Sequence, residues 1–200
     1  MTSISRETNE VMPQPVPRGL AARFPELQTI IGVFAVTAFL LYGWTFLNVA
    51  WKIRSWLYNL TSSEIFALLS YAVVFNFLES SVVIAGLLGL CFALPKRILR
   101  DEFEARSVII IVCFLGSMIL HLMINSTDDS LRVNFYQSLR LWWLITFILT
   151  TILAWFLPRL RVVKKALHEF ADRATVFLFI LMPLSLVGFI VIIFRFLFAA

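Results

Sequence analysis

Long, nearly uninterrupted apolar runs constrain this chain more than any other feature. A transmembrane helix needs about 20 mostly apolar residues, because each residue adds about 1.5 Å across a hydrocarbon layer of about 30 Å. Barrel strands are not expected, because they are alternating segments of about ten residues. The sequence therefore predicts an all-α, polytopic helical membrane protein with about five transmembrane helices. The predicted spans are 27–51, 65–94, 107–124, 139–157 and 174–198.

The composition excludes a soluble fold for most of the chain. Of 200 residues, 60% are hydrophobic and only 14% are charged, whereas soluble domains have about 45–50% apolar and about 25% charged residues. A soluble protein of this size could not bury so many apolar side chains, so lipid must be their solvent. Cys91 and Cys113 both fall in apolar runs. We expect them to be small packed residues rather than members of a disulfide framework.

The basic residues divide unevenly between the two sides of a membrane crossed five times. Twelve of the 17 Lys and Arg residues lie in the N-terminal segment, the loop after the second span and the segment after the fourth span. Cytoplasmic loops carry the excess of basic residues, so we predict a cytoplasmic N-terminus and an outward C-terminus. We expect a flexible polar tail over 1–25 and a single membrane domain over 26–200, located in the cell membrane.

Capping signals support the span boundaries. Thr61 and Glu64 have the spacing of a capping box at the start of the second span. Pro158 closes the fourth span. Arg195 lies late in the fifth span, where we expect it to reach the outer interface, with lipid phosphate or Glu64 as its partner.

The segment 158–173 has a pattern of its own. Apolar residues recur at helical spacing beside basic residues, which predicts an amphipathic helix on the cytoplasmic leaflet. Its basic side is expected to contact anionic lipid. A basic stripe tethered to a membrane most often sets topology, so no nucleic acid is expected as a partner. The predicted lipid-contacting face consists of Arg161, Lys164 and Lys165.

A carboxyl group interrupts the middle of the second span. Glu79 lies near the expected bilayer midplane, and Asn76 and Ser80 are predicted to share its helical face. An ionisable residue at this depth costs about 2.5–3.5 kcal/mol on insertion scales. We therefore expect Glu79 to be buried in protein rather than in contact with lipid. Two interpretations stay open: a hydrogen bond between helices or subunits, and a proton, cation or substrate site.

A second candidate site lies at the outer end of the third span. His121 is the single histidine inside a predicted span, and Asp128, Asp129 and Arg132 follow it in the outer loop. This group could serve a lipid-modifying reaction, whereas a hydrogen-bonded interfacial histidine is the simpler interpretation. A metal centre needs two or three ligands at ligand spacing. One histidine and two adjacent acids do not provide that, so no metal or other cofactor is expected.

Sequence motifs of enzymes are missing. The sequence has no nucleophile elbow, zinc-protease, Walker or dinucleotide motif, and no catalytic residue is assigned. The favoured interpretation is a structural or accessory subunit, or a scaffold, in a membrane assembly. Its partner would be another copy or a different membrane protein. The alternatives are a small transporter or channel that uses Glu79 and Asn76, and a membrane-embedded lipid or envelope enzyme, or membrane module, with an outer site near His121.

Overall fold

The computed structural model describes residues 25–93, 102–125 and 135–198. In these residues all regular structure is helical, and five helices are long and apolar enough to cross a membrane. The prediction of an all-α chain with about five such helices is therefore confirmed. The elements are α1 (Leu27–Asn59), α2 (Ser62–Ala93), α4 (Phe103–Asn125), α5 (Phe135–Phe156), the short 3₁₀ helix η3 (Leu157–Arg159) and α6 (Arg161–Phe198).

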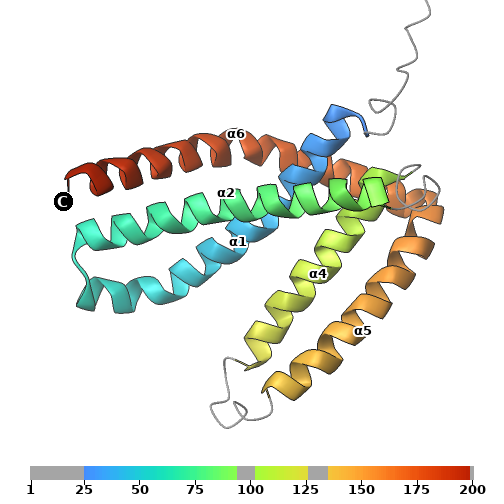
Figure 1. Ribbon diagram of the computed structural model, residues 1–200, viewed down its shortest axis with the longest axis horizontal. Helices are drawn as coiled ribbons and strands as arrows, with labels where there is room; N and C mark the ends of the chain where they lie inside the picture. The colour runs from blue at the N-terminus through green and yellow to red at the C-terminus, as the bar shows by residue number, and fades with distance from the viewer. Residues whose placement is uncertain (1–24, 94–101, 126–134, 199–200) are drawn as a thin grey trace, which may run out of the picture.

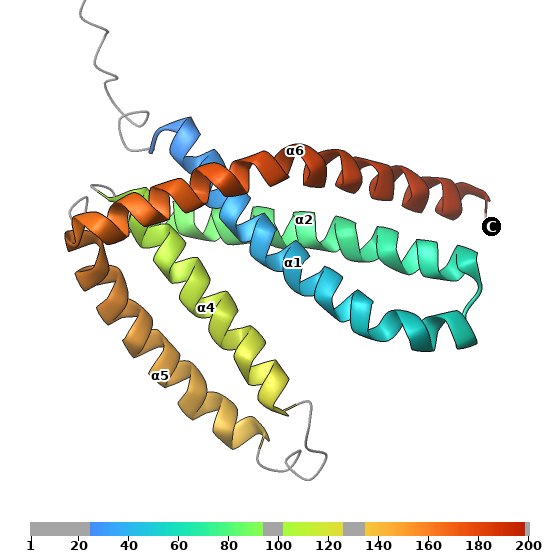
Figure 2. The same cartoon turned by 180° about the vertical axis from the view of Figure 1, so that it is seen from behind.

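The helices form two arms that diverge from a shared end (Figure 1). One arm contains α2, most of α1 and the second part of α6, and the other is the hairpin of α4 and α5 (Figure 2). α1 packs against α2, α4 and α6, whereas α5 packs against α4 and η3. α1 begins at the shared end, and α6 ends at the far tip of the first arm (Figure 1).

The best-buried part of the molecule lies where α1 crosses its neighbours. Small and β-branched side chains of α1, including Val33, Ala35 and Val36, are completely buried. α1 and α6 also pack closely at Gly32, where an added Cβ atom would lie 3.5 Å from the Cβ atom of Ala171, in ordinary van der Waals contact. Membrane helices associate largely through such close backbone packing, since lipid is as apolar as their side chains. Large apolar side chains are left on the outer surface of every long helix.

The largest departure from the predicted boundaries is in α6. The sequence predicted an amphipathic segment over 158–173 separate from a span over 174–198, but one helix runs from Arg161 to Phe198. The residues around 173 contain no glycine or proline, so nothing there breaks the helix. With 38 residues, α6 is about 57 Å long, nearly twice the hydrocarbon thickness of about 30 Å. Its first part, as far as Arg173, carries most of its charged residues, and the apolar part follows.

Half of the predicted capping box is present at the start of α2: the Glu64 side chain reaches back to Thr61, whereas the Glu64 backbone N–H donates to the Thr61 carbonyl oxygen at 3.1 Å and not to its hydroxyl. Both the backbone N–H and the hydroxyl of Thr61 donate to the Glu64 carboxylate, each at 2.8 Å. Glu64 and Arg195 line the same hollow between α2 and α6, so the arginine lies at the end of the bundle where α2 begins.

Candidate functional site

The polar residues at the middle of α2 lie on two different sides of the helix. Asn76 and Ser80 are buried, whereas Glu79 is exposed. Thr45 of α1 donates its hydroxyl to the Asn76 side-chain oxygen at 3.0 Å, and the Ser80 hydroxyl donates to the backbone carbonyl of Asn76 at 2.7 Å. Within this chain Glu79 therefore does not share the buried side of Asn76 and Ser80, and its burial against a neighbouring protein stays a prediction. Asn76 and Glu79 are about 60° apart around the helix axis, and the contact with α1 ends between them.

A second buried polar contact joins all three helices of the first arm. The Tyr42 hydroxyl of α1 lies 3.0 Å from the carbonyl oxygen of Val73 in α2 and 2.5 Å from the Ser185 hydroxyl in α6. Close by, a Cβ atom added to Gly188 of α6 would lie only 3.1 Å from the carbonyl oxygen of Ser70. The inward face of α2 is therefore fixed by contacts within the chain. Tyr42 and Ser185 carry no signal in the sequence, because isolated hydroxyl groups are common in apolar runs.

The outward face of α2 is open. Glu79 lies at the edge of this face that is nearest Asn76, with no hydrogen bond or ion pair to any other described residue. Val82, one turn further, is 70% exposed, and a Cβ atom added to Gly86 or Gly89 would meet no atom within 4 Å. At 3.6 residues per turn these positions form one continuous strip. We call this strip, made of Phe75, Glu79, Val82, Gly86 and Gly89, the Glu79 face.

His121 packs inside the α4–α5 hairpin. Its ring is buried, and its centroid lies 5.2 Å from that of Trp142 in α5. The Trp142 indole N–H donates to the Ser117 hydroxyl at 2.7 Å, and that hydroxyl lies 2.6 Å from the Thr146 hydroxyl. His121 is therefore one of the packed aromatic side chains in the contact between α4 and α5.

The rest of the predicted outer site, Asp128, Asp129 and Arg132, lies outside the described residues. The geometry of that group with His121 therefore stays a prediction. Among the described residues, no group of three or more His, Cys, Asp or Glu side chains is placed to bind a metal ion.

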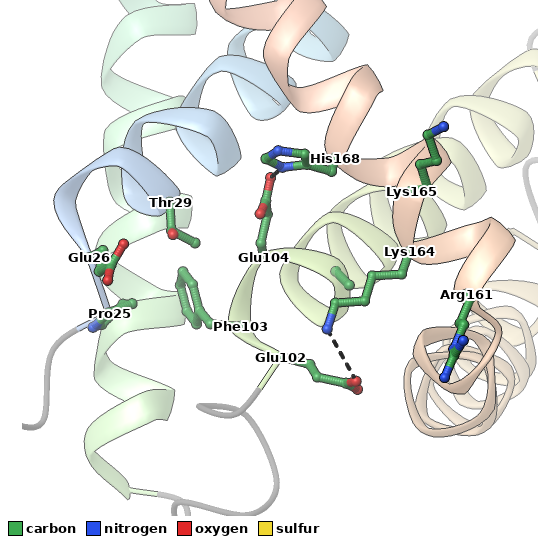
Figure 3. A pocket seen from close by; sticks show the side chains of 11 residues that line it. Pro25, Glu26, Thr29, Glu102, Phe103, Glu104, Arg161, Lys164, Lys165 and His168 are labelled. Atoms are coloured by element: carbon green, nitrogen blue, oxygen red, sulfur yellow. Dashed lines mark hydrogen bonds and ion pairs between the residues drawn. The ribbon is translucent and has the colours of Figure 1, made fainter.

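A polar cavity of about 760 Å³ lies at the shared end of the two arms, between the starts of α1, α4 and α6. Glu104 of α4 faces His168 of α6, and Lys164 reaches toward Glu102 (Figure 3). The His168 Nδ1 atom lies 2.9 Å from a Glu104 carboxylate oxygen, and the Lys164 Nζ atom lies 3.7 Å from a Glu102 oxygen. These contacts tie the charged part of α6 to the start of α4.

The predicted lipid-contacting residues all border this cavity. Arg161, Lys164 and Lys165 are exposed, and Lys165 points away from the His168 contact (Figure 3). The hydrogen bond with Glu104, and then the negative charges of Glu104 and Asp172, raise the pKa of His168 above its ordinary value of 6.5. The protonated ring is therefore favoured at this end of the molecule.

An apolar groove that no sequence pattern predicted lies between α2 and α6. It has a volume of about 510 Å³ and is lined by residues that include Leu78, Pro183 and Phe189. Its lining has the chemistry of a contact with an acyl chain or another apolar side chain.

Five long apolar helices, apolar outer surfaces and close helix packing through small residues are the features of a multi-pass helical membrane protein. The chain matches no known family model, and no curated protein or solved structure is significantly similar to it. Its function must therefore be argued from the two faces of α2, the hairpin and the polar cavity.

Proposed function

We propose that this chain is a non-catalytic subunit of a membrane assembly and that the Glu79 face is its contact with the rest of that assembly. The observation that carries the proposal is the exposure of Glu79 at the middle of α2. In this proposal the five helices cross the cell membrane with the N-terminus in the cytoplasm and the C-terminus outside.

The physical argument is the cost of a carboxyl group in lipid. Glu79 is about 26 Å along the helix from the start of α2 and about 21 Å from its end. At such depth an uncovered carboxyl costs about 2.5–3.5 kcal/mol on insertion scales. A neighbouring protein that supplies a hydrogen-bond partner reduces this cost. Asn76, at nearly the same depth, needs no such neighbour for its side-chain oxygen, because Thr45 already donates to it.

Association is favoured over transport by the directions of the polar groups. A path through a single chain that used both Glu79 and Asn76 would need them on one side of α2, but one is exposed and the other is buried. The Tyr42 and Ser185 hydroxyls, which also lie between the helices, are held in a short contact with each other. We also do not place a reaction at His121, because its ring is packed against Trp142.

The charged start of α6 fits the cytoplasmic leaflet in this arrangement. The helix is too long for the hydrocarbon layer, and its excess length carries Arg161 and Lys165, both exposed. Basic residues near the surface are attracted by anionic lipid, by about 1 kcal/mol each. We propose that these two residues contact anionic lipid headgroups, while Lys164 is partly engaged by Glu102.

Photo-crosslinking in intact cells tests whether protein or lipid covers the Glu79 face. A photoreactive amino acid would replace Val82, and in a matched control it would replace Phe179, which is 79% exposed on α6. We expect protein adducts at position 82 and mainly lipid adducts at position 179. Lipid adducts alone at position 82 would contradict the proposal.

A further inference from the structure

We infer that the neighbour on the Glu79 face is a second copy of this chain, with the two Glu79 carboxyl groups hydrogen-bonded to each other. This inference rests on the proposed function, which holds that the face is covered by protein. It adds the identity of the partner, the symmetry of the contact and the group at its centre.

The membrane itself brings the two carboxyl groups to the same level. Copies inserted in one orientation place residue 79 at the same depth, and a two-fold axis along the membrane normal presents the same strip from both sides. Any different partner would need its own polar group at that depth. In this chain the described basic residues lie toward the helix ends, so a second copy offers Glu79 another Glu79 rather than an arginine or lysine.

The chemistry of the carboxyl group suits a partner identical to itself. In an apolar environment the neutral acid is much cheaper than the carboxylate. A neutral carboxylic acid has one O–H donor and keeps acceptor capacity. Two such groups can therefore donate to each other and leave neither donor unpaired.

The shape of the strip allows the two α2 helices to come close. A Cβ atom at Gly86 or Gly89 would meet no atom of the described residues within 4 Å, so these glycines pack against none of the described helices. Glycine on an outward helix face lets two backbones approach, which favours contacts between membrane helices. Gly86 lies two turns after Glu79 on nearly the same side of α2, so close approach there would bring the carboxyl groups within reach.

Self-association in lipid vesicles tests this inference. The full chain, labelled with donor or acceptor dyes, would be reconstituted at a series of protein-to-lipid ratios, and energy transfer would report dimer formation. We expect Glu79→Leu and Gly86→Leu to weaken association by about tenfold or more, the loss expected for one interhelical hydrogen bond or close contact. Glu79→Gln keeps a donor and an acceptor and should retain most of the association.

Gly116→Leu is the matched control. Gly116 lies on α4, where an added Cβ atom also meets no atom within 4 Å, so this variant should associate like the unchanged chain. An independent readout uses Val82→Cys with Cys91→Ala and Cys113→Ala. Two differently tagged copies of that variant should form a mixed disulfide across the contact.

The outcomes separate this inference from the proposed function. A chain that stays monomeric at every ratio, or Glu79→Leu that associates as strongly as the unchanged chain, would overturn the inference. If photo-crosslinking at position 82 still captured a different protein in cells, the proposed function would stand without the second copy. If it captured only lipid, both would fail.

Discussion

The two faces of α2 carry polar side chains at nearly the same depth but meet different surroundings. Asn76 is buried against α1 and accepts a hydrogen bond from Thr45, whereas Glu79, three residues later, is exposed. The same contrast holds for glycine, because Gly188 of α6 packs against the inward face while Gly86 lies on the open one. The direction of a polar or small residue therefore decides whether it stabilises one chain or is available to a partner.

The largest effect is expected from enlarging a glycine on the inward face. In Gly188→Leu the first added atom would lie 3.1 Å from a backbone oxygen of Ser70, and overpacking of this kind costs about 1–3 kcal/mol or more. Gly86→Leu meets open space, so in dilute detergent, where copies are separated, it should change the free energy of unfolding by less than about 0.5 kcal/mol. Denaturant unfolding of both variants measures these changes in the free energy of unfolding. Equal losses of stability in the two variants would contradict the distinction between the inward and the open face.

A smaller effect is expected from removing the two polar groups in turn. Asn76→Leu loses the bond from Thr45 and leaves that hydroxyl to find another acceptor, at a cost of about 1 kcal/mol. Glu79→Leu removes a group that has no hydrogen bond or ion pair among the described residues of the chain, so the stability of the separated chain should be unchanged or higher. Unfolding in dilute detergent compares them. A larger loss for Glu79→Leu would mean that the carboxyl group is bound within the chain.

The sequence predicts features that depend on residues close together in the chain, but not features that depend on contacts between distant residues. The presence of five long apolar helices and the contact of Glu64 with Thr61 depend on neighbours in sequence, and both were predicted. The exposure of Glu79 depends on where α1 crosses α2, and that crossing is fixed by contacts such as Tyr42 with Ser185, which are 143 residues apart. The continuity of α6 was missed because a change from charged to apolar residues was interpreted as a boundary, although helix propensity does not fall there.

The smallest effect is expected at the charged end of α6, where the contact is solvated. Protonated His168 binds Glu104 better than the neutral ring does, so this contact is fully present below about pH 6.5 and weakens as the pH rises through the raised pKa. Because the His168 side chain is 60% exposed, water screens the interaction and its effect on stability should be slight. The His168–Glu104 contact therefore shows how little a solvated polar contact contributes to stability, compared with the polar contacts buried between the helices.

A histidine NMR titration measures this directly, since the chain has only two histidines. Replacing His121 with Gln leaves a single histidine signal to follow. Glu104→Gln should return the pKa of His168 toward 6.5. Glu169→Gln should lower this pKa less, because the charge of Glu169 contributes least to the shift. An unchanged titration in Glu104→Gln would refute the contact.

The most direct test of the central claim, that Glu79 belongs to a dry contact and not to a water-filled path, is its access to water in cells. Glu79→Cys, with Cys91→Ala and Cys113→Ala, would be treated with a small membrane-impermeant thiol reagent. Tyr58→Cys, at a 91% exposed position near the α1–α2 turn, is the positive control. We predict labelling at position 58 and none at position 79. Labelling at position 79 would contradict the account and make transport the better explanation of the carboxyl group.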